Sequence, residues 1–418
     1  MKIAIITENF LPKVDGVTRT LARLLEHLAS KGHQVLLLGP ETNNTSYAGA
    51  ELVGTWGIPL FVYPELKCNF WRPKFTEKLL SFKPDVIHLV DPVFLGAFGL
   101  AMIRFYLPQT PIVSSYHTNL AVYCNHFGFG FMTSIMWHWN RYCHSFSQSV
   151  ACPSVSTQSI LNDHGFQHVR IWPRGVDISL FSPQQRSNAL RSEWLGTSDP
   201  KKIILYVGRI SFEKNIHLVI EAYKKMDHHQ CHLVLVGHGP ALDEIERYCA
   251  TTHLPVTFTG YLQGGDLSQA YASADIFAFP SVTETFGQVV LESMASGLPV
   301  VGLKAEGVRD LVVQSKTGLL LDHEGMSVQE QIAKYRCMLE SLVNQPNTLS
   351  LMSKQAVDHA KQYTWHEAME CMVKLYHEAT HIPYSIQTKD LHTMDYDSGV
   401  EEDFSPTQEC HDPLPIIF

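Results

Sequence analysis

The chain has 418 residues and 45% of them are hydrophobic, so it can form two or three domains with substantial cores. The formal net charge is −9, but residues 381–418 contain eight acidic residues and one lysine, which leaves the rest nearly neutral. No Lys- or Arg-rich stripe argues for nucleic-acid binding, and no apolar run is long enough to cross a bilayer.

Cysteine and histidine spacing points away from a disulfide framework or a metal centre. The nine cysteines are scattered without a C-x-x-C pair, which favours reduced thiols. The 22 histidines contain no H-E-x-x-H motif or other metal-ligand spacing, so no metal is expected. Residues 1–8 reach an acid too early for a secretory leader. A cytoplasmic protein is therefore expected.

The first part of the chain alternates apolar runs with amphipathic stretches. Helices are predicted at 16–30, where leucines recur at helical spacing, and at 95–106. Strands are predicted at residues 2–6, 34–38, 85–89 and 111–115. Alternation of this kind predicts a parallel, doubly wound α/β sheet.

The pattern restarts after a break near residues 183–200. Strands are predicted at 202–207, 232–236, 256–259 and 275–279, and helices at 217–226, 241–251 and 267–274. Two successive α/β domains follow, residues 1–182 and 183–363, with a ligand cleft at the carboxyl ends of their strands. Residues 364–380 form a last helical segment, and the acidic residues 381–418 are expected to be disordered.

The most informative stretch runs over residues 280–301. Glu284 lies on a polar loop after a strand, and Glu292 lies in a helix that starts near Phe286 and ends at Gly297. A helix N-terminus suits a phosphate, and Gly287 would let the backbone approach it. Glu292 could then accept ribose hydroxyls and Glu284 those of a second sugar, which indicates a nucleotide sugar. The alternative is a strand–loop–helix unit with two solvated glutamates.

Two cations follow the strand that ends at Gly208. Arg209 and Lys214 lie on the loop before the next helix, where they could neutralise a departing diphosphate without a metal. A solvated pair is the alternative. Gly237 forms a tight turn between a strand and a helix, and Tyr261 follows another strand, where its ring could stack near a base. A plain βα turn explains Gly237 equally well.

The first domain contributes further strand-end residues. Gly16 opens the first helix, so its amides would face the cleft, and Asp15 lies just before it on the loop from the first strand. Arg19 of that helix could meet an anionic acceptor. Exposed helix arginines are the common alternative. Tyr116 and His117 follow a strand, where His117 could contact a ligand or be a core histidine.

Five segments together resemble the family-4 retaining glycosyltransferases, which have two Rossmann-like domains in the arrangement called GT-B. They are Thr-Glu-Asn-Phe-Leu-Pro (7–12), Ser-Tyr-His-Thr (115–118), Arg-Gly-Val-Asp (174–177), Gly-Arg-x4-Lys (208–214) and Glu-x7-Glu (284–292). Residues 115–123 look like the sulfoquinovosyl-diacylglycerol synthase subgroup and related lipid mannosyltransferases. Asn119 and residues 124–131 depart from that subgroup.

The resemblance implies transfer of a hexosyl group, with retention, from a UDP- or GDP-linked sugar to an acceptor, including lipids such as diacylglycerol or a phosphoinositide. It also implies a last helix that crosses back to the first domain, and no metal or other cofactor. The implied catalytic residues are His117, Glu284, Arg209 and Lys214. The implied donor-binding residues are Gly16, Arg209, Lys214, Gly237, Tyr261, Glu284, Phe286, Gly287, Gln288, Val289 and Glu292. The implied acceptor-side residues are Asp15, Arg19 and Tyr116.

Other functions stay open at this stage. A disaccharide phosphorylase of the same fold would use inorganic phosphate, a non-catalytic protein would bind the donor without turnover, and a nucleotide-sugar epimerase is a third alternative. The aromatic residues 127–139 could dock on a membrane surface from the cytosolic side or pack in the core.

Overall fold

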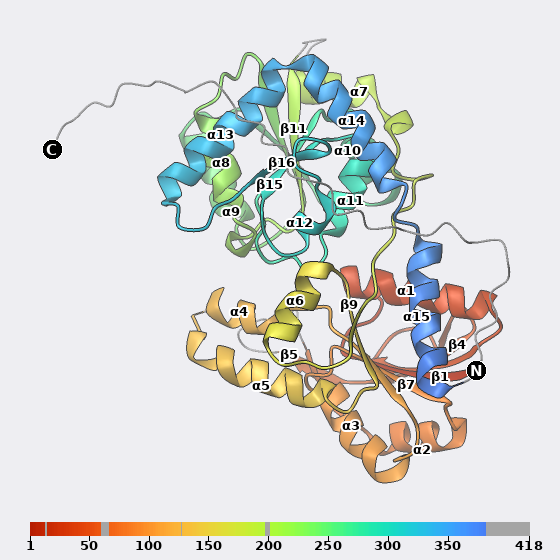
Figure 1. The fold of residues 1–418 in the computed structure, drawn as a ribbon. Helices are drawn as coiled ribbons and strands as arrows, with labels where there is room; N and C mark the ends of the chain where they lie inside the picture. Colours follow the sequence, from red (N-terminus) through yellow and green to blue (C-terminus); the bar gives the residue numbers. More distant parts are fainter. Residues whose placement is uncertain (13–14, 60–66, 127, 197–200, 382–418) are drawn as a thin grey trace. The chain divides into compact units, whose positions relative to one another are not determined.

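The computed structural model describes residues 1–381, apart from 13–14, 60–66, 127 and 197–200 (Figure 1). It contains two parallel sheets, each flanked by helices, as the sequence predicts. The N-terminal half holds the first sheet and the C-terminal half the second. The expected tail, apart from residue 381, and Phe127 of the aromatic segment lie outside the described residues.

The first sheet has the strand order β10-β9-β8-β7-β1-β2-β4-β3, parallel except for β3. Its strands are β1 (Lys2–Thr7), β2 (Gln34–Pro40), β3 (Ser46–Tyr47), β4 (Ala50–Thr55), β7 (Val86–Val90), β8 (Ile112–Ser115), β9 (Ser149–Cys152) and β10 (Val169–Ile171). A separate hairpin pairs β5 (Gly57–Pro59) with β6 (Lys67–Asn69). The central strands are buried on both faces, which explains their continuous apolar sequence.

Several α-helices from the described part of the N-terminal half accompany the first sheet. They are α1 (Gly16–Ser30), α2 (Pro73–Phe82), α3 (Leu95–Tyr106), α4 (Leu120–His126), α5 (Thr133–His144) and α6 (Val155–Asp163), with a 3-10 turn η1 (Gly130–Met132) before α5. Helix α1 begins where predicted because Asp15 and Thr18 form a capping box. Its leucines, at helical spacing, are buried against the sheet.

The second sheet has the order β13-β12-β11-β14-β15-β16. Its strands are β11 (Lys202–Val207), β12 (Cys231–Val236), β13 (Val256–Gly260), β14 (Ile276–Phe279), β15 (Val300–Leu303) and β16 (Gly318–Leu321). This is the Rossmann order 3-2-1-4-5-6. Successive strands are added toward one edge of the sheet up to the third strand, and toward the other edge from the fourth strand on. Ligands bind such sheets at the carboxyl side of that reversal, here between β11 and β14.

Helices cover both faces of the second sheet (Figure 1). They are α7 (Asn188–Leu195), α8 (Ile216–Lys224), α9 (Leu242–Thr251), α10 (Gly264–Ser273), α11 (Gln288–Ala295), α12 (Val308–Leu311), α13 (Val328–Asn344) and α14 (Pro346–Ala360), with 3-10 turns η2 (Pro183–Gln185) and η3 (Phe212–Lys214). The sequence patterns located α8 to α11 within a few residues.

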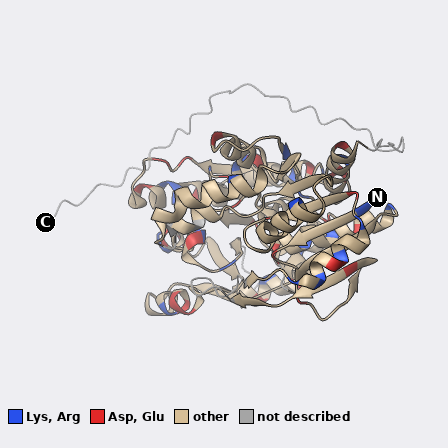
Figure 2. Cartoon of the chain, turned by 90° about the horizontal axis from the view of Figure 1, so that it is seen from below, with Lys and Arg blue, Asp and Glu red and all other residues tan. Residues whose placement is uncertain are grey.

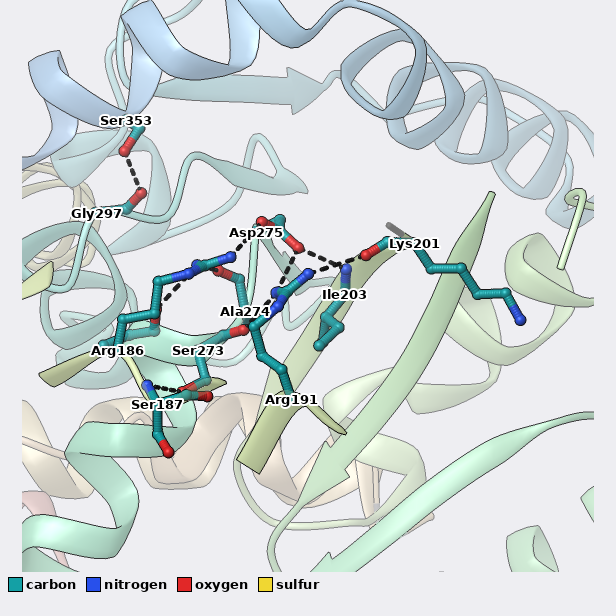
Figure 3. Close-up of polar contacts among 11 residues, drawn as sticks. Arg186, Ser187, Arg191, Lys201, Ile203, Ser273, Ala274, Asp275, Gly297 and Ser353 are labelled. Atoms are coloured by element: carbon teal, nitrogen blue, oxygen red, sulfur yellow. Dashed lines mark hydrogen bonds and ion pairs between the residues drawn. The ribbon is translucent and has the colours of Figure 1, made fainter. Parts of the chain in front are cut away.

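One carboxylate ties the start of this half to its central strands (Figure 3). Asp275, just before β14, accepts hydrogen bonds from Arg186 at 3.2 Å, Arg191 at 2.9 Å and the backbone amide of Ile203 at 2.8 Å. Arg191 also donates to the carbonyl oxygen of Lys201 at 3.0 Å. These bonds fix α7 and β11 at the end of the sheet opposite the predicted site.

The last helix, α15 (Trp365–Thr380), packs on the N-terminal half, as the resemblance implies. Its Glu370 lies 2.8 Å from Nε2 of His27 and 2.6 Å from Nζ of Lys31, both in or next to α1. The chain crosses between the halves at Gly175, where a Cβ would meet the backbone nitrogen of Trp365 at 2.1 Å. Only glycine allows the two crossing segments to approach this closely.

Charges are dispersed over the fold (Figure 2), with Lys and Arg among Asp and Glu. Over the described residues, no helix is both long and apolar enough to cross a membrane.

Candidate active site

Arg209, Lys214 and Glu284 lie on the loops at the carboxyl ends of β11 and β14. Nζ of Lys214 donates to Oε1 of Glu284 at 2.6 Å and to Oγ1 of Thr283 at 3.1 Å. Ser281 also donates to Oε1 of Glu284, at 3.0 Å. The Nε of Arg209 lies 3.9 Å from Oε1 of Glu213, four residues further along the chain. The sheet order therefore brings two cations and one carboxylate to the position where Rossmann-like folds bind ligands.

Glu292 has different partners, because it contacts the N-terminal half. Its Oε1 accepts from Arg19 of α1 at 3.2 Å, and its Oε2 accepts from the hydroxyl of Tyr271 at 3.2 Å. Burial raises the pKa of Glu292 to about 7, although Arg19 acts in the opposite direction. Glu292 is thus a carboxylate that folding desolvates, and Arg19, predicted for the acceptor side, lies against it.

The residues between the two glutamates form the turn into α11. Gly287 has a φ of +93°, a left-handed conformation that favours glycine, and it caps the helix. Gln288 donates from Nε2 to the carbonyl oxygen of Gly175 at 3.0 Å. Phe286 is buried in the core and Val289 packs against it. Phe286 and Val289 thus serve packing here, and their predicted donor contact stays a prediction.

Gly237 and Tyr261 follow neighbouring strands of the second sheet. A Cβ on Gly237 would lie 1.9 Å from the carbonyl oxygen of Gly208, so close packing of the two strand-end loops already requires glycine there. Tyr261 is 57% exposed, so its ring is accessible to a ligand. The predicted contacts of both residues with a nucleotide stay predictions.

His117 is the centre of a buried polar network in the N-terminal half. Its Nδ1 accepts from Arg174 at 2.9 Å, and its Nε2 lies 2.8 Å from Oγ of Ser115. Its backbone amide donates to Asp91 at 2.7 Å. Burial, with Arg174 nearby, lowers the pKa of His117 well below its usual value. The carbonyl oxygen of His117 accepts from Thr285 at 2.7 Å, so this residue reaches the loop of Glu284.

The other first-half predictions have distinct surroundings. Asp15 accepts from the amide of Thr18 at 2.8 Å, so its carboxylate caps α1. A Cβ on Gly16 would meet no atom of the described residues within 4 Å. Tyr116 is buried in a cluster with Phe166 and Leu161, and its hydroxyl has no hydrogen-bond partner among the described residues. An acceptor-side role for Tyr116 stays a prediction that its burial does not favour.

A contact zone between α6 and the loop after β15 was not predicted from the sequence. Thr157 donates to Glu306 at 2.6 Å, Ser156 donates to Asp310, and the amide of Gly307 donates to Ser156 at 2.9 Å. Glu306 also accepts from Asn119 at 3.3 Å. Residues 304–310 follow a buried strand, as Glu284 does, and that shared position is the signal that could have revealed them.

One group of described side chains is arranged so that it could hold a metal ion: His27, His366 and Glu370. It lies between α1 and α15 and includes none of the predicted catalytic residues. Lys31 already contacts the same Glu370 oxygen that faces His27.

The geometry defines a class of protein. Two Rossmann-like sheets, a helix that returns from the second to the first, and cations with carboxylates at strand ends are the features of a GT-B transferase that uses a nucleotide-linked donor. The fold is shared with a solved structure: the sucrose-phosphate synthase of Thermosynechococcus elongatus superposes with a TM-score of 0.74 at 21% identity, over 90% of this chain and 98% of that one.

Sequence comparison places the chain in a family. Residues 14–180 match the profile described as "Glycosyltransferase Family 4", and residues 191–356 match "Glycosyl transferases group 1". The chain is 37% identical over 332 residues to a GDP-mannose-dependent alpha-mannosyltransferase of Mycolicibacterium smegmatis. The matched region covers 78% of this chain and 85% of the relative.

Two other relatives extend this range. The sulfoquinovosyl transferase SQD2 of Arabidopsis thaliana is 31% identical over 85% of this chain and 69% of its own length. An alpha-monoglucosyldiacylglycerol synthase of Streptococcus pneumoniae is 26% identical over 77% of this chain and 75% of its own length. The chain belongs to glycosyltransferase family 4 and is a hexosyltransferase that uses a nucleotide-sugar donor.

Proposed function

We propose that this enzyme transfers a hexosyl group, with retention and without a metal, from a GDP- or UDP-linked sugar to a lipid acceptor. The observation that carries the proposal is the Arg209, Lys214 and Glu284 cluster at the reversal point of the second sheet. Two cations there can stabilise the departing diphosphate, which is the role a metal would otherwise have. The relative named for GDP-mannose supports a mannosyl donor.

Each carboxylate then has a separate task. In the structure Glu284 neutralises Lys214, so an incoming diphosphate would compete with Glu284 for that ammonium group. Release of the Glu284 carboxylate would leave it able to accept hydrogen bonds from the hydroxyls of the donor sugar. Glu292, held by Arg19 and Tyr271, would accept from the ribose. In this proposal the leaving phosphate takes the acceptor's proton in a front-side displacement.

An exposed apolar face supports the lipid acceptor. It comprises exposed aromatic and aliphatic side chains of α3, η1 and α5: Phe98, Phe105, Tyr106, Phe131, Ile135, Trp139 and Tyr142. The two helices adjoin, because Trp139 donates to the carbonyl oxygen of Val93 at 2.9 Å and Tyr142 contacts Phe146, over which Arg104 lies. Neither α3 nor α5 contains Asp or Glu, and each contains one arginine. These properties suit a membrane surface.

Donor turnover is the test of the proposed reaction. Purified protein would be incubated with GDP-mannose and a panel of UDP- and ADP-sugars, with and without diacylglycerol or phosphoinositide vesicles, and released nucleotide would be measured. Turnover of one donor that Glu284→Gln and Arg209→Ala abolish supports the proposal. Turnover that needs inorganic phosphate and releases a sugar phosphate would instead identify a phosphorylase. Donor binding by calorimetry without turnover would identify a binding protein.

Flotation with vesicles tests the membrane contact. The wild type should float with vesicles that contain anionic lipid, and the double variant Phe105→Ser/Phe131→Ser should stay in the soluble fraction, because those two side chains are 75% and 76% exposed. A wild type that stays in the soluble fraction with neutral and anionic vesicles alike would contradict the proposed membrane contact.

A further inference from the structure

A continuous chain of buried hydrogen bonds runs from His117 to the return helix. His117 Nε2 lies 2.8 Å from Oγ of Ser115, and the same oxygen lies 2.8 Å from Nε2 of His88 on β7. Nδ1 of His88 lies 2.7 Å from the hydroxyl of Tyr376 on α15. Ser115, His88 and Tyr376 are fully buried, so each hydrogen bond is shielded from water.

The contact with Arg174, at the His117 end of these hydrogen bonds, fixes the tautomer of His117. An arginine can only donate, so Nδ1 of His117, 2.9 Å from Arg174, must be the acceptor. The neutral ring then has its proton on Nε2, which donates to Ser115. Arg174 is itself held by the carbonyl oxygen of Trp172 at 2.6 Å, and its guanidinium lies 4.5 Å from the centre of the Trp172 ring.

The backbone of His117 contacts the loop of the other half that carries Glu284. The carbonyl oxygen of His117 accepts from Thr285, the residue after Glu284, at 2.7 Å. His117 therefore joins two networks, one through its ring and one through its backbone. The ring of His117 packs against Trp172 at a centroid distance of 5.5 Å, so it has little room to turn by itself. A shift of the ring would therefore also move the His117 backbone that Thr285 contacts.

We propose that Ser115, His88 and Tyr376 are positioning residues for His117, and that they link the return helix α15 to the loop that carries Glu284. This inference rests on the proposed function, in which Glu284 accepts hydrogen bonds from the donor sugar, and on the catalytic role that the family resemblance implies for His117. The helix that closes the fold is then also a support of the active site. Removal of a single hydroxyl at Tyr376, far along the chain from either glutamate, should slow the reaction.

The test compares two tyrosines. Tyr376→Phe removes one buried hydroxyl and leaves the ring. Tyr335→Phe is the matched control. Tyr335 is also fully buried, and its hydroxyl donates to the carbonyl oxygen of Val301 at 2.7 Å, which is not part of the hydrogen bonds between His117 and Tyr376. Tyr376→Phe should lower kcat on the order of tenfold, as misplaced catalytic groups do, with the donor KM within about twofold. Tyr335→Phe should leave both constants unchanged. Equal losses in the two variants would overturn the proposal.

A double variant shows whether Tyr376 acts through His117. In a His117→Ala background, Tyr376→Phe should cause no additional loss of kcat, whereas independent contributions would multiply and contradict the proposal. Nitrogen-15 NMR of labelled histidines gives a readout that needs no donor. The wild type should show His117 protonated at Nε2, with ring signals that shift in Tyr376→Phe and stay in place in Tyr335→Phe. Unshifted His117 signals in Tyr376→Phe would refute the link even if no donor were turned over.

Discussion

The two glutamates of the Glu-x7-Glu motif lie eight positions apart in the sequence, yet they have different electrostatic surroundings. Glu284 pairs with Lys214 of its own half at 2.6 Å, and both side chains keep some exposure, 20% and 15%. Glu292 pairs with Arg19 of the other half at 3.2 Å, and its side chain is only 3% exposed. Burial raises the pKa of Glu292 to about 7. The motif therefore combines a partly solvated ion pair with a desolvated carboxylate at a contact between the halves.

This difference separates catalysis from assembly. A partly exposed lysine and glutamate can exchange partners with an incoming diphosphate at modest cost, because water screens them in the absence of ligand. A buried carboxylate near a single cation is costly to keep charged, and its energy depends on the contact with α1. Substitutions around Glu284 should therefore act mainly on turnover, whereas substitutions around Glu292 should also change stability and its dependence on pH.

The largest effect should come from Lys214. Lys214→Ala removes a cation that stabilises the departing diphosphate, and kcat should fall by about 100- to 1000-fold, as when a preorganised electrostatic group is lost. The melting temperature should change little, because the pair is partly exposed. Steady-state nucleotide release and thermal unfolding measure the two quantities.

Lys304 provides the control for that experiment. It pairs with Asp322 at 3.4 Å in the same half, with more than half of each side chain exposed. Lys304→Ala should leave kcat unchanged. Comparable losses of activity in both variants would show that Lys214 has no special place in the reaction.

Glu292→Gln should change how stability depends on pH. Because the folded state holds the Glu292 proton more tightly than the unfolded chain, the wild type loses stability as the pH rises from about 4.5 to about 7. The loss amounts to about 3 kcal/mol for a shift of this size. Glutamine does not titrate, so the free energy of unfolding of the variant, relative to that of the wild type, should be higher above pH 7 than near pH 4.5.

Urea unfolding at a series of pH values measures this difference. Glu8 and Asp91 also have pKa values raised by burial, to about 7 and about 6, so only the difference between variant and wild type isolates Glu292. Glu324→Gln, at an exposed position, is the control and should parallel the wild type. A constant difference across the pH range would contradict a desolvated Glu292.

Arg19→Ala tests the other partner of that pair. Loss of the guanidinium leaves the Glu292 carboxylate with less compensation and raises its pKa further, because Arg19 acts to lower it. The expected cost is about 1 kcal/mol in the free energy of unfolding, and it should be larger at pH 8 than at pH 6.

Arg23 is the matched control one turn along the same helix. It pairs with Glu26 at 3.1 Å and lies 3.7 Å from Asp177, and its side chain is 45% exposed. Arg23→Ala should change stability by less than about 0.5 kcal/mol at either pH. Equal effects of the two arginine variants would mean that the contact with Glu292 contributes nothing particular.

Local signals explain what the sequence could predict. The α1 bounds followed from apolar residues at helical spacing. The gathering of Arg209 and Glu284 at one edge of the second sheet followed from their positions after parallel strands. The fold and the family resemblance are confirmed by the sheet order and by the relatives.

Contacts between distant segments had no such signal. Arg19 and Glu292 are 273 residues apart, and no sequence pattern indicates that Glu292 is buried beside Arg19. The same holds for Thr157 with Glu306, and for His88 with Tyr376. Tyr116 shows a related difficulty, because a tyrosine just after a strand can point to a ligand or to the core, and packing against Phe166 settles its position. Such pairings depend on how the sheets and helices assemble, which spacing alone does not encode.

The smallest expected effect concerns Gly16, the first residue of α1 and a neighbour of Arg19. An added Cβ would meet no atom within 4 Å in the part of the chain that the structure describes, so Gly16→Ala should change the free energy of unfolding by less than about 1 kcal/mol. If the amides of α1 approach the donor phosphates, that methyl group should raise the donor KM severalfold and leave kcat nearly unchanged, since only close approach is hindered. Gly265→Ala, an equally open position at the start of α10, is the control and should leave KM unchanged. A donor KM that stays constant in both variants would place the phosphates away from α1 and leave Arg19 as its contribution at the Glu292 contact.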